Sequence, residues 1–161
     1  MSLRRSGTLV IGVGNAFRSD DAVGLIVAQR LKQASFDNVT VREESGEGAA
    51  LIDAWHGAGA VVLIDAVCSG AEPGTVHRLD AQSQPVPAKF RCYSTHAFGV
   101  AEAIELARAL NQLPPVCTVY GIEGKSFTAG VGLSPEVEGA AQQVVERVMQ
   151  DLRENGLPHS G

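Results

Sequence analysis

The sequence predicts an α/β fold with three layers, in which a mostly parallel, twisted sheet of about five strands carries helices on both faces. Short runs of β-branched and aliphatic residues alternate along the chain with longer segments whose apolar residues recur every three or four positions. This alternation is typical of parallel strands joined by crossover helices. The clearest strand, Ala60–Val67, reads AVVLIDAV, a continuous apolar run typical of a strand that is buried on both faces of a sheet.

The first half of the chain alternates predicted strands and helices. A buried strand over Thr8–Val13 is followed by a glycine turn and then by a helix whose apolar positions run from Ala22 to Leu31. Residues 43–48, EESGEG, form an acidic, glycine-rich loop. The other predicted elements in this half are a strand at Val39–Arg42, a helix at Ala49–His56 and the strand at Ala60–Val67.

The second half continues the pattern with longer connections. A short strand at Thr75–Leu79 is expected to pair beside the preceding strand, and Asp80–Cys92 is expected to be a loop because it contains two prolines. Ser94–His96 is expected to open a helix, and a buried strand follows at Val116–Ile122.

The last helix has the strongest boundary signals. Ser134 is its expected cap, Pro135 its first helical residue, and an unbroken apolar stripe continues until Gly156. We therefore expect a single domain over residues 1–156, followed by a flexible tail over residues 157–161.

The composition excludes several classes of protein. Hydrophobic residues make up 45% and charged residues 19% of the 161 residues, which is a globular balance. The net charge of −5 gives no reason to expect a nucleic-acid partner, and no apolar run is long enough for membrane insertion. The three cysteines show no CxxC spacing, which favours reduced thiols and a cytoplasmic location. We expect a monomer.

Two neighbouring acids, Asp20 and Asp21, stand where the glycine turn becomes the first helix. The GxG at the start of this turn suggests dinucleotide binding, but Phe17 occupies the third glycine position and the two acids would repel a pyrophosphate. Two interpretations remain. In the structural one, Ser19 caps the helix and each acid interacts with the helix dipole, which contributes at most about 1 kcal/mol. In the functional one, an acid faces the cleft and binds a cation or transfers a proton.

The predicted topology brings other polar side chains to the same edge. Asp65 stands near the carboxyl end of its strand and His96 at the mouth of a helix, so both are expected near Asp20 and Asp21. Two carboxylates and an imidazole suit zinc, nickel, manganese or iron, and they also suit acid–base chemistry without a metal. Each also has a structural interpretation, since Asp65 can accept backbone hydrogen bonds and His96 can be a polar helix terminus. The other histidines are expected to be structural or solvated; they are His56, His77 and His159.

Four segments resemble the maturation endopeptidases of nickel–iron hydrogenases, and they occur in the order seen in that family. They are GVGNAFRSDDAVG (Gly12–Gly24), LIDAV (Leu63–Val67), STHAFGV (Ser94–Val100) and GIEGKSFTAGVGLSPEV (Gly121–Val137). The resemblance covers nearly the whole chain. It implies an endopeptidase that removes a C-terminal peptide from a nickel-loaded hydrogenase large-subunit precursor.

The resemblance also implies the site. Its metal-contacting and catalytic residues would be Asp21, Asp65 and His96, with Asp21 standing where many members have Glu. The nickel would be supplied by the substrate, and another divalent metal could occupy the site in vitro. Asn15 and Asp20 are expected to orient the turn.

Several alternatives stay open. The metal could assist catalysis or could serve only for recognition, with a carboxylate as the base, so the endopeptidase could be metal-dependent or aspartyl-type. The protein could instead be a non-catalytic module that binds nickel or the precursor, or a related peptidase that serves another metalloprotein. The loops at 43–48 and 124–132 are expected to flank the site and to hold the precursor.

Overall fold

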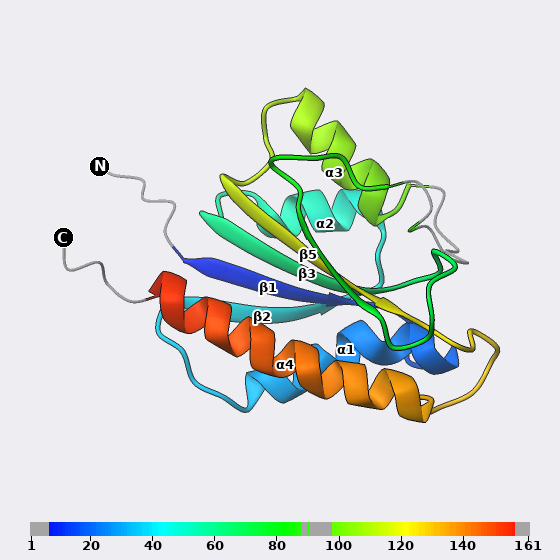
Figure 1. Cartoon of the computed structure of the whole chain (residues 1–161). Helices are drawn as coiled ribbons and strands as arrows, with labels where there is room; N and C mark the ends of the chain where they lie inside the picture. The colour runs from blue at the N-terminus through cyan, green and yellow to red at the C-terminus, as the bar shows by residue number, and fades with distance from the viewer. Residues whose placement is uncertain (1–6, 88–89, 91–97, 157–161) are drawn as a thin grey trace.

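The computed structural model describes residues 7–87, 90 and 98–156, and these residues form one five-stranded sheet with helices on both faces (Figure 1). The strands are β1 (Thr8–Val13), β2 (Val39–Glu44), β3 (Ala60–Val67), β4 (Val76–Asp80) and β5 (Val116–Glu123). The helices are the short 3-10 helix η1 (Ser19–Ala22), α1 (Val23–Lys32), α2 (Gly48–Trp55), α3 (Val100–Ala109) and α4 (Pro135–Gly156). The predicted fold class is confirmed.

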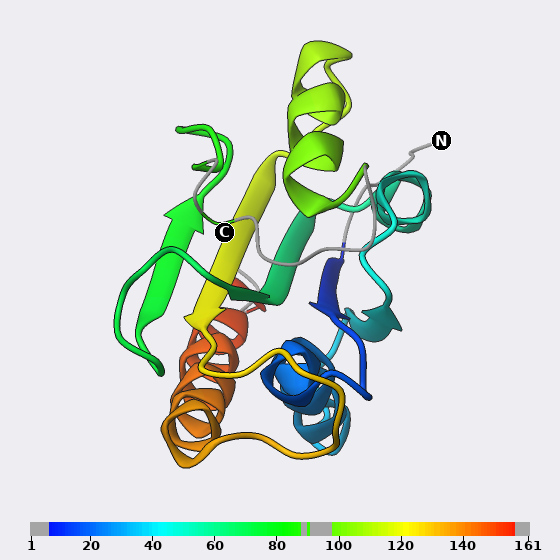
Figure 2. The ribbon, with the colours of Figure 1, turned by 90° about the vertical axis from the view of Figure 1, so that its right-hand side faces the viewer.

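The strand order is β2-β1-β3-β5-β4, with the first four strands parallel and β4 antiparallel to β5. The expected pairing of the short strand with β3 is wrong. Both sides of β3 are already occupied by β1 and β5, so β4 pairs with β5 and forms an edge of the sheet (Figure 2). Val76 lies opposite Ile122 in this pair, and Asp80 lies opposite Thr118. The carboxyl ends of β1, β2, β3 and β5 therefore lie along one rim.

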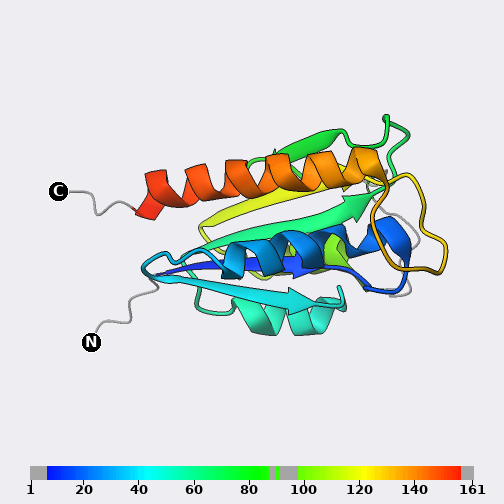
Figure 3. The same cartoon turned by 90° about the horizontal axis from the view of Figure 1, so that it is seen from below.

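Two apolar layers enclose the sheet. On one face α1 and α4 lie side by side (Figure 3), and on the other face α2 packs beside α3. The stripe of α4 that the sequence predicted is buried against α1 and the sheet; its members include Val137, Ala141, Val144 and Val148. On the other face, Leu51 and Trp55 of α2 pack with Ile104 and Ala107 of α3.

Two glycines allow the start of α1 to lie against the strands. A Cβ on Gly24 would lie 2.3 Å from the carbonyl oxygen of Ile64 and 2.4 Å from that of Val13. A Cβ on Gly12 would lie 2.1 Å from the carbonyl oxygen of Gly24. Since real Cβ atoms do not approach backbone this closely, the absence of side chains at both positions fixes where α1 begins on the rim.

The helix beginnings differ from the sequence predictions at two places. Ser19 does not cap α1, because it has a φ of 52° and its hydroxyl donates to the Thr128 carbonyl at 2.8 Å. The chain enters α1 through η1 instead. Helix α3 begins at Val100 after the non-helical Gly99, whose N–H donates to Glu102 at 3.0 Å, and not at Ser94–His96, which lies outside the described residues.

The cysteines differ from the expectation of reduced thiols. Cys117 is a buried free thiol, but Cys68, just after β3, is disulfide-bonded. Spacing along the chain does not report which thiols meet in space. Within residues 7–87, 90 and 98–156, none of the helices combines the length and the apolar character that a bilayer crossing needs.

Candidate active site

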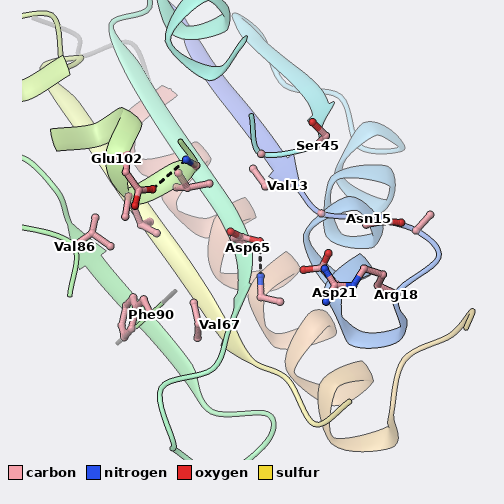
Figure 4. A pocket seen from close by; sticks show the side chains of 18 of the residues that line it. Val13, Asn15, Arg18, Asp21, Ser45, Asp65, Val67, Val86, Phe90 and Glu102 are labelled. Atoms are coloured by element: carbon pink, nitrogen blue, oxygen red, sulfur yellow. Dashed lines mark hydrogen bonds between the residues drawn. The ribbon is translucent and has the colours of Figure 1, made fainter. Parts of the chain in front are cut away.

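A cavity of about 530 Å³ opens at the carboxyl ends of β1 and β3, on the side covered by α3 (Figure 4). Its lining comes from the turn after β1, the end of β3, the loop after β2 and the first turn of α3. Open parallel sheets bind ligands in this place, because loops from several strands meet there. The predicted 43–48 loop contributes Ser45 and Gly46 to the lining.

Asp65 stands in the cavity, near the carboxyl end of β3. Its Oδ1 accepts a hydrogen bond of 2.8 Å from the N–H of Ala66, and no other described residue donates to it. Burial raises the pKa of Asp65 well above its ordinary value, the charge of Asp21 raises it further, and the Ala66 hydrogen bond lowers it. Hydrogen bonding to the backbone, which was the structural interpretation of Asp65, therefore satisfies only one of its two carboxylate oxygens.

Asp21 approaches the same cavity from η1, on the side of the turn after β1 (Figure 4). Burial raises the pKa of Asp21, while the nearby charge of Arg18 and a hydrogen bond from the backbone of Asn15 lower it. The backbone of Asn15 thus contacts the acid. The side-chain Oδ1 of Asn15 also accepts the N–H of Phe17 at 2.9 Å, which shapes the turn.

The two acids form a like-charged pair in a partly desolvated cavity. Each would gain from a cation placed between them, because a positive charge relieves both the desolvation and the mutual repulsion. The chemistry of the pair fits a divalent metal with oxygen ligands, and it also fits proton transfer to or from a bound water. Among the described residues no group of three or more His, Cys, Asp or Glu could hold a metal ion. His96, the third predicted member, lies outside these residues.

Asp20 has a different role from its neighbour. It is fully buried and points away from the cavity into the loop between β5 and α4. Its carboxylate accepts the N–H groups of Lys125, Ser126 and Ser134 and the hydroxyl of Ser134, at 2.8–2.9 Å. Burial raises its pKa, but these four hydrogen bonds outweigh burial and the pKa is lowered. Asp20 thus joins the acidic turn to the 124–132 loop.

Sequence reasoning missed several residues that surround the acidic pair. Arg18 lies beside Asp21, and an apolar wall lies on the opposite side of Asp65 (Figure 4). That wall includes Val67, Val86, Phe90, Val100 and Val119. The position of Arg18, three residues before Asp21, was a signal for the charge partner, whereas no local pattern marked Phe90.

A second buried carboxylate lies at the end of β5. Glu123 accepts both the N–H and the hydroxyl of Ser69, and it contacts His77 Nε2 at 3.1 Å. The ring of His77 also packs on Phe90, with 4.8 Å between centroids. These contacts agree with the structural role expected for His77, and they fix the start of the β3–β4 connection near Asp65.

The sequence profile of the hydrogenase maturation protease family, HycI, matches residues 25–151. This chain belongs to the hydrogenase maturation protease family. The match covers most of the chain, including the strand that carries Asp65 and most of the helices around the cavity.

Individual relatives agree with the family assignment. The hydrogenase 2 maturation protease of Escherichia coli is 30% identical over 153 residues, which cover 92% of each chain. A putative hydrogenase maturation protease of Methanocaldococcus jannaschii is 29% identical and covers 94% of this chain and 99% of its own. The structure of the maturating endopeptidase HybD from E. coli superposes with a TM-score of 0.81 at 29% identity, over 93% of this chain and 94% of HybD. The predicted family, the fold and the enzyme class, a hydrolase acting as an endopeptidase, are confirmed for this maturation protease.

Proposed function

We propose that this maturation protease removes a C-terminal peptide from a nickel-loaded hydrogenase large-subunit precursor. The observation that supports this most directly is the approach of Asp21 and Asp65 from different elements into one cavity on the carboxyl rim of the sheet. Membership of the maturation protease family supports the choice of substrate. We place the processing in the cytoplasm, where the precursor is synthesised, and we propose that the protease acts as a monomer.

The acidic pair recognises the nickel that the substrate carries. Asp21 and Asp65 supply oxygen ligands, and His96 supplies an imidazole nitrogen as the third. The electrostatics favour this role, because both carboxylates are desolvated and Asp21 raises the pKa of Asp65 by repulsion. No resident metal is needed, since the cation enters with the precursor, and another divalent metal can occupy the same ligands in vitro.

The scissile bond docks beside this pair. Hydrolysis adds one water across the amide: its oxygen bonds to the carbonyl carbon, the C–N bond breaks, and the leaving nitrogen gains a proton. In this proposal a carboxylate of the pair takes the proton from the attacking water. Asp21, Asp65 and His96 would hold the nickel, and its positive charge would polarise the scissile carbonyl or hold it in place.

The test uses the purified protease with nickel-loaded precursor and with nickel-free precursor, and mass spectrometry of the products. Loss of a C-terminal peptide from the loaded form alone is the expected result. Cleavage of both forms would still identify an endopeptidase, but it would rule out a nickel-recognition role for Asp21, Asp65 and His96. Binding of the loaded precursor without any product would identify a non-catalytic binding module. Cleavage of another metalloprotein precursor in its place would identify a related peptidase.

A further inference from the structure

Two apolar side chains of the described chain are unusually exposed, and one of them, Phe17, lines the cavity. Phe17 exposes 71% of its surface and Val131 exposes 82%, the highest values among the exposed large hydrophobic residues of the described chain. The other such residues lie on α3 and at the amino end of β5; they are Leu106, Leu110 and Val116, exposed by 41–54%. Single exposed apolar residues are common on proteins, so exposure alone does not mark a site.

Backbone hydrogen bonds tie the turn that carries Phe17 to Gly130, the neighbour of Val131, although 113 positions separate Phe17 from Gly130. The N–H of Gly130 donates to the carbonyl of Phe17 at 2.9 Å, and the N–H of Ser19 donates to the carbonyl of Gly130 at 3.0 Å. Arg18 and Gly130 thereby form an isolated parallel β-bridge. The two most exposed apolar side chains thus sit on two loops that are tied to each other.

The turn that carries Phe17 is fixed before any partner binds. Asn15 Oδ1 accepts the N–H of Phe17 at 2.9 Å, and the carbonyl of Asn15 accepts the N–H of Arg18 at 3.3 Å. The backbone of such a turn loses little conformational freedom when a partner covers it. Such a preorganised aromatic residue is the kind that contributes most to binding at protein interfaces.

Phe17 also lines the cavity that holds Asp21 and Asp65. We infer that Phe17 and Val131 form a docking patch for an apolar surface of the precursor next to its cleavage site. This inference rests on the proposed function, because it takes the precursor as the partner. Phe17 belongs both to the patch and to the cavity lining, on the side of the turn that carries Asp21, so a precursor whose cleaved bond lies beside the acidic pair lies next to Phe17.

The test compares Phe17→Ala and Val131→Ala with Leu110→Ala, a truncation of a similarly exposed residue at the end of α3. Binding of nickel-loaded precursor is measured by calorimetry, and its processing is measured as KM and kcat. We expect Phe17→Ala to raise Kd and KM by about tenfold and Val131→Ala by about threefold, with kcat within about twofold. Leu110→Ala should match the wild type.

Three results would overturn the inference in different ways. If both patch variants bind the precursor with wild-type affinity and the wild type processes it normally, the docking role of the patch is ruled out and the proposed function stands. If the wild-type protein neither binds nor cleaves the precursor, both the proposed function and the docking role of the patch are ruled out. Dimerisation of the wild type in sedimentation experiments, lost in Phe17→Ala, would assign the patch to a second copy of this chain.

Discussion

The carboxylate of Asp20 accepts two hydrogen bonds from Ser134, one from the backbone N–H and one from the hydroxyl, each 2.8 Å long. These residues lie 114 positions apart, at the entrance to α1 and at the start of α4. The same carboxylate holds Lys125 and Ser126. One buried side chain therefore fixes the loop between β5 and α4 relative to the turn that carries Asp21.

Replacing Asp20 by Ala should destabilise the protein by about 3 kcal/mol or more, because it leaves several buried N–H groups without an acceptor. The free energy of unfolding, measured in urea, checks this. Asp53→Ala is the matched control, since Asp53 is an exposed acid on α2, and it should change stability by no more than about 0.5 kcal/mol. Equal stability of the two variants would show that the Asp20 hydrogen bonds contribute little.

Asp20 should also make the stability depend on pH. Its pKa in the folded protein lies below the ordinary 3.8, so the unfolded chain binds this proton more tightly than the folded protein does. The ionised carboxylate stabilises the fold at pH values above 3.8, and this contribution is lost as the pH falls through the folded-state pKa. The stability difference between wild type and Asp20→Asn should therefore shrink between about pH 5 and about pH 2 in urea titrations. A difference that stays constant would contradict this.

Gly24→Ala should reduce the melting temperature, and the loss of stability should be about 2 kcal/mol or more, since the new Cβ would meet the carbonyl oxygens of Ile64 and Val13. Gly139→Ala in α4 is the matched control. Its Cβ would meet nothing within 4 Å, so this change should stabilise the helix by up to about 1 kcal/mol. Thermal unfolding followed by circular dichroism measures both. A Gly24→Ala variant as stable as the wild type would mean that α1 can shift on the sheet without cost.

Cys117 should be chemically inert in the folded protein. Burial raises the pKa of its thiol to about 12, with a smaller contribution from the charge of Asp80, so the reactive thiolate is scarce at neutral pH. Iodoacetamide at about pH 8 should leave Cys117 unmodified in buffer and alkylate it fully in urea. Peptide mass spectrometry distinguishes the two states, and rapid labelling in buffer would show that the core around β5 opens readily.

The sequence was sufficient for most of the fold, because the buried strands of a parallel sheet are continuous apolar runs and α4 has a complete apolar stripe. It predicted the strand β4 but failed for its pairing, since five residues of an edge strand do not specify a partner. It also misplaced the start of α3, because the capping contact between Gly99 and Glu102 is not visible as an apolar pattern.

The candidate site was predictable only in part. The carboxyl end of a buried strand marked Asp65, and the family resemblance selected Asp21. The spacing of apolar residues did not distinguish Asp20 from Asp21, because it does not show which way each of two neighbouring acids points. On the 3-10 turn the two side chains point in different directions. The structure separates them: Asp20 is satisfied by four hydrogen bonds, while Asp21 faces Asp65 across the cavity. The charge of Arg18 and the apolar wall come from tertiary packing, which the local sequence does not report.

The central claim is that Asp21 and Asp65 serve processing rather than folding, and Asp65→Asn tests it most directly. Burial and repulsion raise the pKa of Asp65, so its ionised form costs stability at neutral pH and the neutral Asn should leave the free energy of unfolding unchanged or higher. Processing of nickel-loaded precursor should fall by about 100-fold or more, while Asp53→Asn should process normally. A folded Asp65→Asn variant that cleaves the precursor at the wild-type rate would contradict the account.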